Sequence, residues 1–413
     1  MILRELTNDE FNAFTNNNYT SIYQSSNYAL TMTKQGFECY YFGILEDNKI
    51  YGASLILLKK EHGFKYAYVP RGYLIDYNNF ELLKEYNDLL KKQLKKMGIV
   101  GIRINPPIIK GVLQNNNFIN NNNYENMFNN LKKLGYNHLG YNNYFEGLKP
   151  RYEAIIQLNK NIPSIFYRIH KSFRTKIRSA DHNGIKIFKA DENNLDILFM
   201  QTKNKYPRDL KYFQDMYYYF KNNDKIDLYY SLLNTSDYVK NVQLKYQQQT
   251  IKCNQANANV FKNVGKNNTR SINKKLYEEN KLNIIKKELV YATKLLKDFP
   301  QGIITSSVLI LKNKSEVYMI MDGYDKTYKQ LNSKHLLIWK LIEKYANEGY
   351  KIFNLGGIGN YNLKDNKYVG LTEFKINFGA VIYEYCGDFE LVINKPMHLL
   401  FKNSSAVMNL LRK

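Results

Sequence analysis

The run Lys351-Ile-Phe-Asn-Leu-Gly-Gly-Ile-Gly359 is followed, after a polar loop, by Tyr368-Val-Gly-Leu-Thr-Glu-Phe-Lys-Ile-Asn-Phe-Gly379. The apolar residues of Ile352–Leu355 predict a buried strand, and the glycines of 356–359 are typical of a turn. These glycines lack the complete dinucleotide-binding pattern and a clear helix start, so they alone do not indicate a phosphate site. The stretch therefore predicts a strand and a turn at the end of an α/β unit.

Lys375 is the residue of this stretch that is best suited to take part in a reaction. It lies among Phe374, Phe378 and Gly379, in a segment whose pattern looks half buried. An ammonium held there could stabilise a developing oxyanion without transferring a proton. The other reading from the residues alone is a lysine that extends its charge to solvent from the edge of a core.

The elements around this stretch predict two successive α/β units with mixed sheets. The first unit, residues 1–150, has strands at Cys39–Leu45, Ile50–Leu58, Tyr66–Val69 and Val100–Ile104, and a helix at Asn79–Met97. The second unit, residues 151–384, has strands at Glu153–Leu158, Ile185–Lys189, Gly302–Leu311 and Glu316–Met321, and helices at Ile165–Asn183 and Lys334–Asn347. Residues 385–413 are expected to pack back on the first unit.

The segment Tyr238–Leu296 interrupts the second unit. It is polar at first, and its later part repeats apolar residues at alternating spacings of three and four: Leu282, Ile285, Leu289, Ala292 and Leu296. Gly265-Lys-Asn-Asn268 could reverse the chain. We predict a helical hairpin, with two ordinary surface helices as the alternative.

Composition limits the class of protein but does not identify a partner. The 413 residues carry a formal net charge of +23, which favours polyanions such as RNA, nucleotide diphosphates or an anionic membrane surface. A general bias toward Lys, Asn, Ile and Tyr could explain part of the excess. Cys39, Cys253 and Cys386 have no metal-like spacing, and the sequence contains neither a signal peptide nor an apolar run long enough to span a membrane. We expect a cytoplasmic protein without a metal or cofactor, with peripheral contact at the inner face of the cell membrane left open.

Several short motifs occur together in an order that resembles the Fem family of peptidoglycan-bridge aminoacyltransferases. In addition to the Tyr368–Lys375 segment, the matching segments are Tyr23-Gln-Ser-Ser-Asn-Tyr-Ala29 with Lys34, Tyr68-Val-Pro-Arg-Gly72 with Asp76, Arg103-Ile-Asn-Pro106, Phe173–Ala180 and Tyr206-Pro-Arg-Asp-Leu-Lys-Tyr-Phe213. The resemblance extends from about residue 20 to 390. Each motif is modest, and their ordered combination is specific.

The resemblance implies two acetyltransferase-like domains, with a coiled-coil arm inserted in the second at residues 238–296. It also implies an aminoacyltransferase that moves Gly, Ala or Ser from aminoacyl-tRNA to an amine of the peptidoglycan precursor or growing cross-bridge. Family members that act on lipid-linked precursor carry such an arm, and relatives that act on soluble nucleotide precursors can lack it, so we prefer a lipid-linked precursor to a UDP-linked muropeptide.

The resemblance also implies roles for individual residues. Lys375 would stabilise the oxyanion, and Phe374 would shape the pocket. The precursor would be held by Lys34, Arg208 and Tyr212, and the tRNA backbone by the basic helix residues Lys171, Arg174, Lys176 and Arg178. For Lys34, Arg208 and the basic helix, solvated surface charge is the competing interpretation.

Asn105 departs from the family pattern, because the family has an aspartate there. An amide cannot act as a general base, so no protein general base is assigned. A mechanism in which the substrate's own phosphate handles the proton would tolerate the change. For Arg71 and Asp76 we favour a structural pair that stabilises a turn.

Two other functions remain open from the sequence. An acyl-CoA-dependent N-acetyltransferase would need a pyrophosphate loop, of the form Q/R-x-x-G-x-G/A at a helix start, which the sequence lacks. A non-enzymatic RNA-binding protein would account for the charge and the predicted arm.

Overall fold

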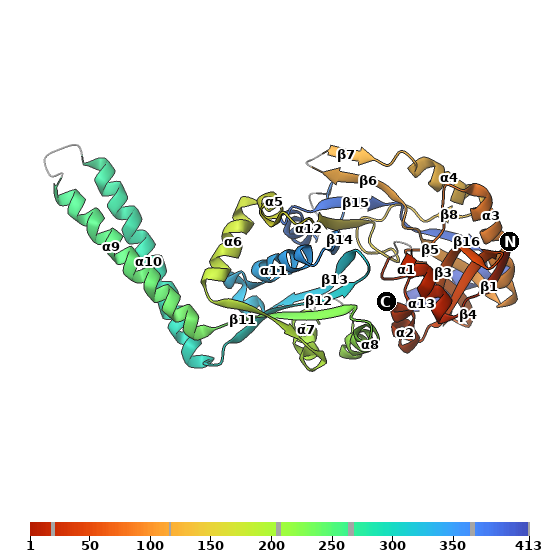
Figure 1. The fold of residues 1–413 in the computed structure, drawn as a ribbon, viewed down its shortest axis with the longest axis horizontal. Coiled ribbons are helices and arrows are strands. Elements are labelled where there is room, and N and C mark those ends of the chain that lie inside the picture. The colour runs from red at the N-terminus through yellow and green to blue at the C-terminus, as the bar shows by residue number, and fades with distance from the viewer. Residues whose placement is uncertain (18–20, 115–116, 204–207, 263–267, 364–367, 412–413) are drawn as a thin grey trace.

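The computed structural model describes residues 1–17, 21–114, 117–203, 208–262, 268–363 and 368–411 (Figure 1). The first sheet has the order β1-β2-β3-β4-β5-β16-β8, and the second has the order β10-β11-β12-β13-β14-β9-β15-β6-β7. The strands of the first sheet are β1 Ile2–Glu5, β2 Glu38–Glu46, β3 Lys49–Glu61, β4 Phe64–Pro70, β5 Ile99–Asn105, β16 Phe389–Val392 and β8 Asn137–His138. Those of the second are β10 Ile185–Ala190, β11 Ile226–Leu233, β12 Ile303–Lys312, β13 Glu316–Tyr324, β14 Ile352–Ile358, β9 Tyr152–Gln157, β15 Val381–Tyr385, β6 Ile109–Gln114 and β7 Asn117–Asn120.

Helices cover both sheets and connect their strands. The α-helices are α1 Asn8–Asn17, α2 Ser26–Lys34, α3 Phe80–Lys96, α4 Tyr124–Lys133, α5 Ile162–Arg168, α6 Lys171–His182, α7 Leu195–Thr202, α8 Leu210–Lys221, α9 Thr235–Lys262, α10 Thr269–Asp298, α11 Ser333–Asn347, α12 Val369–Ile376 and α13 Lys395–Leu411. Two short 3₁₀ helices are η1 Glu192–Asn194 and η2 Lys326–Leu331. The predicted mixed α/β class is confirmed.

Each sheet contains a parallel pair joined through one α-helix, but the two pairs differ at their carboxyl ends. β4 and β5 stay paired up to Pro70 and Asn105. β13 and β14 pair only over Glu316–Tyr318 and Ile352–Asn354, although both strands continue. The second parallel pair therefore separates and leaves space between its strands.

Gly356 and Gly357 lie within β14, so the prediction of a simple turn at these glycines was wrong. The pairing of β14 with β9 shifts register between Asn354 and Gly357, and Gly356 has a φ of 79°. The Asn354 side chain accepts a hydrogen bond of 2.8 Å from the Gly356 N–H. Glycine makes this bulge possible because the left-handed φ region strains other residues.

The predicted single helix Ile165–Asn183 was also wrong, because it is two helices. Ile169 and His170 have extended backbone angles between α5 and α6. The His170 N–H donates to the Asn377 carbonyl at 2.9 Å, and its side chain caps Ser172. Buried Ile165, Ile169 and Phe173 keep an apolar spacing across the break, which is why the sequence pattern looked continuous.

The strands of the two sheets do not follow the predicted ranges 1–150 and 151–384. β6 and β7 come from the first range but join the second sheet, since β6 pairs antiparallel with β15. The chain returns to the first sheet through β16, which pairs with β5, and α13 contacts β5.

Apolar side chains form one core under each sheet and a third core between them. The third core joins Leu55 of β3 to Phe213 of α8 and Leu309 of β12. This shared core packs the two units against each other and supports the residues that connect them.

α9 and α10 form an antiparallel hairpin that projects away from the second sheet (Figure 1). Its base is anchored by Tyr238 and Val242 of α9 and by Ala292 and Leu295 of α10, which belong to the second sheet's core. The predicted reversal at Gly265, Lys266 and Asn267 lies outside the described residues. Among the helices described, none is both long and apolar enough to cross a membrane.

Candidate active site

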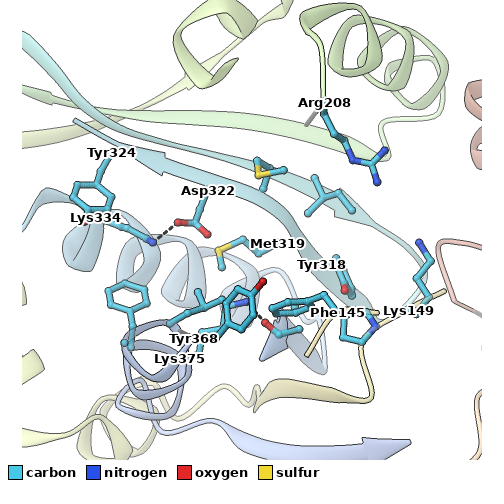
Figure 2. Close-up of a pocket in the computed structure, with 18 of the residues that line it drawn as sticks. Phe145, Lys149, Arg208, Tyr318, Met319, Asp322, Tyr324, Lys334, Tyr368 and Lys375 are labelled. Carbon is cyan, nitrogen blue, oxygen red and sulfur yellow. Dashed lines mark hydrogen bonds and ion pairs between the residues drawn. The ribbon is translucent and has the colours of Figure 1, made fainter. Parts of the chain in front are cut away.

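A cavity of about 830 Å³ lies where β13 and β14 separate (Figure 2). Its wall includes Met319–Asp322 of β13, Gly356 and Gly357 of β14, the start of α11, and α12. Residues 147–150, before β9, and Arg208 and Tyr212, at α8, complete it. The cavity is thus built by the separated strands and closed by segments distant in sequence.

Lys375 extends from α12 into this cavity and is only 6% exposed. Its Nζ donates a hydrogen bond of 2.8 Å to the Gly357 carbonyl. A Cβ added at Gly356 would lie 3.3 Å from the Met319 carbonyl oxygen and 3.5 Å from Lys375 Nζ. The glycine bulge therefore lies against the ammonium, and its Gly357 carbonyl positions it.

An aromatic cluster forms the wall beside Lys375. The Phe374 ring lies 5.6 Å from Phe173 and 5.2 Å from His335, centroid to centroid. Burial, and next the charges of Lys176 and Lys334, lower the pKa of His335 to about 3. Its Nδ1 has no hydrogen-bond partner within the described residues. His335 is therefore a neutral, largely apolar part of the wall at neutral pH.

We expect the neutral state of His335 to make stability depend on pH. The unfolded chain takes up this proton near pH 6.5, whereas the folded chain resists it until about pH 3. The free energy of unfolding should therefore fall as pH drops through that window. His335→Leu should flatten this fall, measured by urea unfolding at pH 7, 5.5 and 4. Parallel curves for the two proteins would contradict the assignment.

Two further basic residues of the cavity are Arg208, at the start of α8, and Lys149, in the loop before β9. The Arg208 guanidinium lies 4.1 Å from the centroid of the buried Tyr212 ring. Lys149 Nζ lies 3.2 Å from the Tyr23 ring centroid. Burial, followed by Arg208 and Arg71, holds the pKa of Lys149 well below its usual range. Arg208 and Tyr212, which were predicted to bind the precursor, thus lie at the same end of the cavity as Lys149, which was not predicted.

The other predicted site residues are divided between the cavity and the surface. Lys176 of α6 lines the cavity, but Lys171, Arg174 and Arg178 do not. Arg174 donates to the Tyr167 carbonyl at 2.8 Å. Lys34 is exposed at the end of α2 and also lies outside the cavity wall. Five of the nine predicted residues therefore meet in one cavity: Lys375, Phe374, Arg208, Tyr212 and Lys176.

Arg71 is buried and joins the two sheets. Its guanidinium donates to Glu153 of β9 at 2.6 Å, to the Asn105 side-chain oxygen at 2.9 Å and to the Pro150 carbonyl at 2.9 Å. The predicted pairing with Asp76 was wrong, because that carboxylate accepts from the Asn78 N–H. Asn105 is fully buried and donates to Asp388, which agrees with a structural role.

The sequence of the whole chain matches the model of the FemAB family over residues 6–405. The chain belongs to the FemAB family. Aminoacyltransferase FemA of Staphylococcus epidermidis is 27% identical to it over 414 residues, 97% of this chain and 98% of the relative. Aminoacyltransferase FemA of Staphylococcus aureus strain N315 is 25% identical over 413 residues, 97% of each chain. The predicted family is thereby confirmed, and the predicted enzyme class agrees with these names.

A solved structure of FemX shares the fold. It superposes with a TM-score of 0.75 at 22% identity and covers 97% of this chain and 99% of its own. The inserted hairpin and the two sheets are therefore parts of one FemAB fold in this chain.

Five lysine, aspartate and histidine residues of this FemAB cavity were not predicted from the sequence: Lys149, Asp322, Lys329, Lys334 and His335. Lys334 and His335 follow Asn332, whose left-handed backbone begins α11. The start of this helix could have marked Lys334 and His335 as candidate site residues, because residues in the first turn of a helix can face a cavity. Asp322 ends an apolar strand run, and nothing in its neighbours pointed to a site.

Proposed function

We propose that this protein transfers an amino acid from aminoacyl-tRNA to an amine of the peptidoglycan precursor or growing cross-bridge, and that the precursor is lipid-linked. One observation carries the proposal: Lys375 is held at the centre of a cavity that also contains Arg208, Tyr212 and Phe374, in a FemAB chain. The projecting hairpin supports the choice of the lipid-linked precursor over the UDP-linked one.

The reaction needs an environment for negative charge on an ester oxygen. The acceptor amine attacks the ester carbonyl, the new C–N bond forms, and charge collects on the carbonyl oxygen. The Lys375 ammonium, kept in place by Gly357, would stabilise that charge. The C–O bond then breaks and releases the ribose hydroxyl of the tRNA. The substrate's own phosphate, rather than Asn105, would accept the proton of the attacking amine and pass it to the departing ribose oxygen.

The two ends of the cavity would hold the two substrates. Arg208 is a cation suited to the phosphates of the precursor, because its guanidinium offers a planar set of donors, and Lys149 lies at the same end of the cavity. Lys176, whose charge helps to lower the pKa of His335 at the aromatic wall, comes from α6, whose outer face carries further basic residues. The acceptor end of the tRNA would enter from that side.

A transfer assay tests the proposal directly. Purified protein would be given glycyl-, alanyl- or seryl-tRNA with lipid-linked precursor, and in parallel with UDP-linked muropeptide. We expect extension of the stem peptide from at least one charged tRNA, with the lipid-linked precursor preferred. Acetyl-CoA offered as the donor should give no product. Absence of transfer from all three tRNAs would contradict the proposed function.

The outer face of α6 should contribute salt-dependent affinity for tRNA. Replacing Lys171, Arg174 and Arg178 with glutamine should weaken tRNA binding and reduce the slope of log affinity against log salt by about two to three, since each lost phosphate contact removes about 0.7–0.9. Filter binding between 50 and 200 mM salt measures this. Replacement of the exposed lysines 91, 92 and 95 of α3 is the charge-matched control. Equal slopes in both variants would place the tRNA elsewhere.

A further inference from the structure

The charge of the cavity wall is strongly one-sided. Among the described residues that line it, six are basic and one carries a carboxylate, Asp322. The basic residues are Lys149, Lys176, Arg208, Lys329, Lys334 and Lys375. Such a wall suits phosphates and an oxyanion, but it repels any ammonium group that a substrate brings in.

Asp322 lies on the separated part of β13. It pairs with Val308 of β12 on one side, and the ladder with β14 has already ended at Tyr318. Its side chain is 13% exposed and forms an ion pair with Lys334 of α11, which is 12% exposed. Lys334 Nζ lies 4.3 Å from the Phe374 ring centroid. The carboxylate is thus held at the aromatic wall that borders Lys375.

The position of Asp322 within the cavity separates it from the precursor-binding end. Figure 2 shows Asp322, Tyr324 and Lys334 at one end and Arg208 and Lys149 at the other, with Lys375 between them. The tRNA side of the proposed reaction is the end that holds Asp322.

We propose that Asp322 binds the α-ammonium of the aminoacyl group on the tRNA donor. This inference rests on the proposed function. An aminoacyl ester carries one positive charge next to its reacting carbonyl, and Asp322 is the one described wall residue of opposite charge. Lys334 neutralises the Asp322 carboxylate when no donor is bound. When the donor's α-ammonium binds, it displaces Lys334 or shares the carboxylate with it.

The α-ammonium of the donor is better suited to bind at Asp322 than the acceptor amine is. The acceptor must be unprotonated to attack, and a neighbouring carboxylate would favour its charged form. The donor's α-ammonium, in contrast, keeps its proton throughout the reaction. Holding it at Asp322 would orient the adjacent carbonyl toward Lys375, and it would exclude donors whose amino group is blocked.

The test compares donors that differ only in this group. Wild-type protein would receive glycyl-tRNA beside glycolyl-tRNA and alanyl-tRNA beside lactyl-tRNA, in which a hydroxyl replaces the amine. We expect the amino form to be favoured about ten- to hundredfold in kcat/KM, because a hydrogen bond to a charged group contributes about 1.5–3 kcal/mol. Asp322→Asn should reduce this preference to a few-fold and raise KM for the charged tRNA, with KM for the precursor unchanged.

Lys334→Met is the matched variant, because it breaks the same ion pair but keeps the carboxylate. It should retain the preference for the amino form. Equal use of both donors by the wild type would overturn the inference, even if the Asp322 variant does not fold. So would an unchanged preference in Asp322→Asn. Transfer from no donor at all would instead overturn the proposed function, and the inference with it.

Discussion

Lys375→Met should lower kcat about 10²–10³-fold, the loss expected when one preorganised oxyanion-stabilising group is removed. Methionine has a similar length and fills the same space between Gly356 and the wall, but it has no charge to offer a developing oxyanion. KM for both substrates should change little, because the ester oxygen gains its negative charge only as the amine attacks. Steady-state transfer kinetics with the best charged tRNA measure both quantities.

The control for this variant must separate lost chemistry from lost structure. The Gly357 carbonyl loses its hydrogen bond in Lys375→Met, so the melting temperature of the variant should be recorded. Lys351→Met removes an exposed lysine just before β14 and should leave kcat at the wild-type level. An unchanged kcat in Lys375→Met would remove this lysine from the mechanism, and a loss shared by both variants would point to a nonspecific charge effect.

The secondary structure was largely predictable because apolar residues repeat with the period of each element. The opening between β13 and β14 could not be predicted from the sequence. Met319, Ile320 and Met321 continue the apolar run of β13, yet they line a cavity where the pattern predicts a paired strand. The separation depends on the bulge at Gly356 and on Asn354, whose side chain also donates to Glu153 at 2.9 Å. The contact between Asn354 and Glu153 joins positions 201 residues apart and has no local signal.

The candidate site was predictable to the extent that family-like spacing marked it. Lys375, Phe374, Arg208 and Tyr212 were identified through motifs, and the structure brings them to one cavity. Tyr206 and Pro207 of the Arg208 motif lie outside the described residues. Asp322 and Lys334 could not be predicted as a pair, because they lie on a strand and a helix that meet only in the folded chain.

Arg71→Met should reduce the free energy of unfolding by about 3–5 kcal/mol, the usual cost of removing one partner of a buried ion pair. Arg71 and Glu153 are 3% and 2% exposed, so the remaining carboxylate would be left charged in a poorly solvated site. The guanidinium also packs 3.6 Å from the Tyr385 ring centroid. Urea unfolding followed by circular dichroism measures the change.

The double variant Arg71→Met with Glu153→Gln is the matched control. It removes the uncompensated charge, so it should recover a substantial part of the lost stability; equal instability of both proteins would show that packing, and not charge, dominates. The network also reaches the cavity of the candidate active site. Glu153 accepts from Asn354, and Asn354 holds the bulge at Gly356 beside Lys375. We therefore expect the single variant to lose kcat below its melting transition, whereas an intact kcat in folded Arg71→Met would separate the ion pair between the sheets from the geometry of the site.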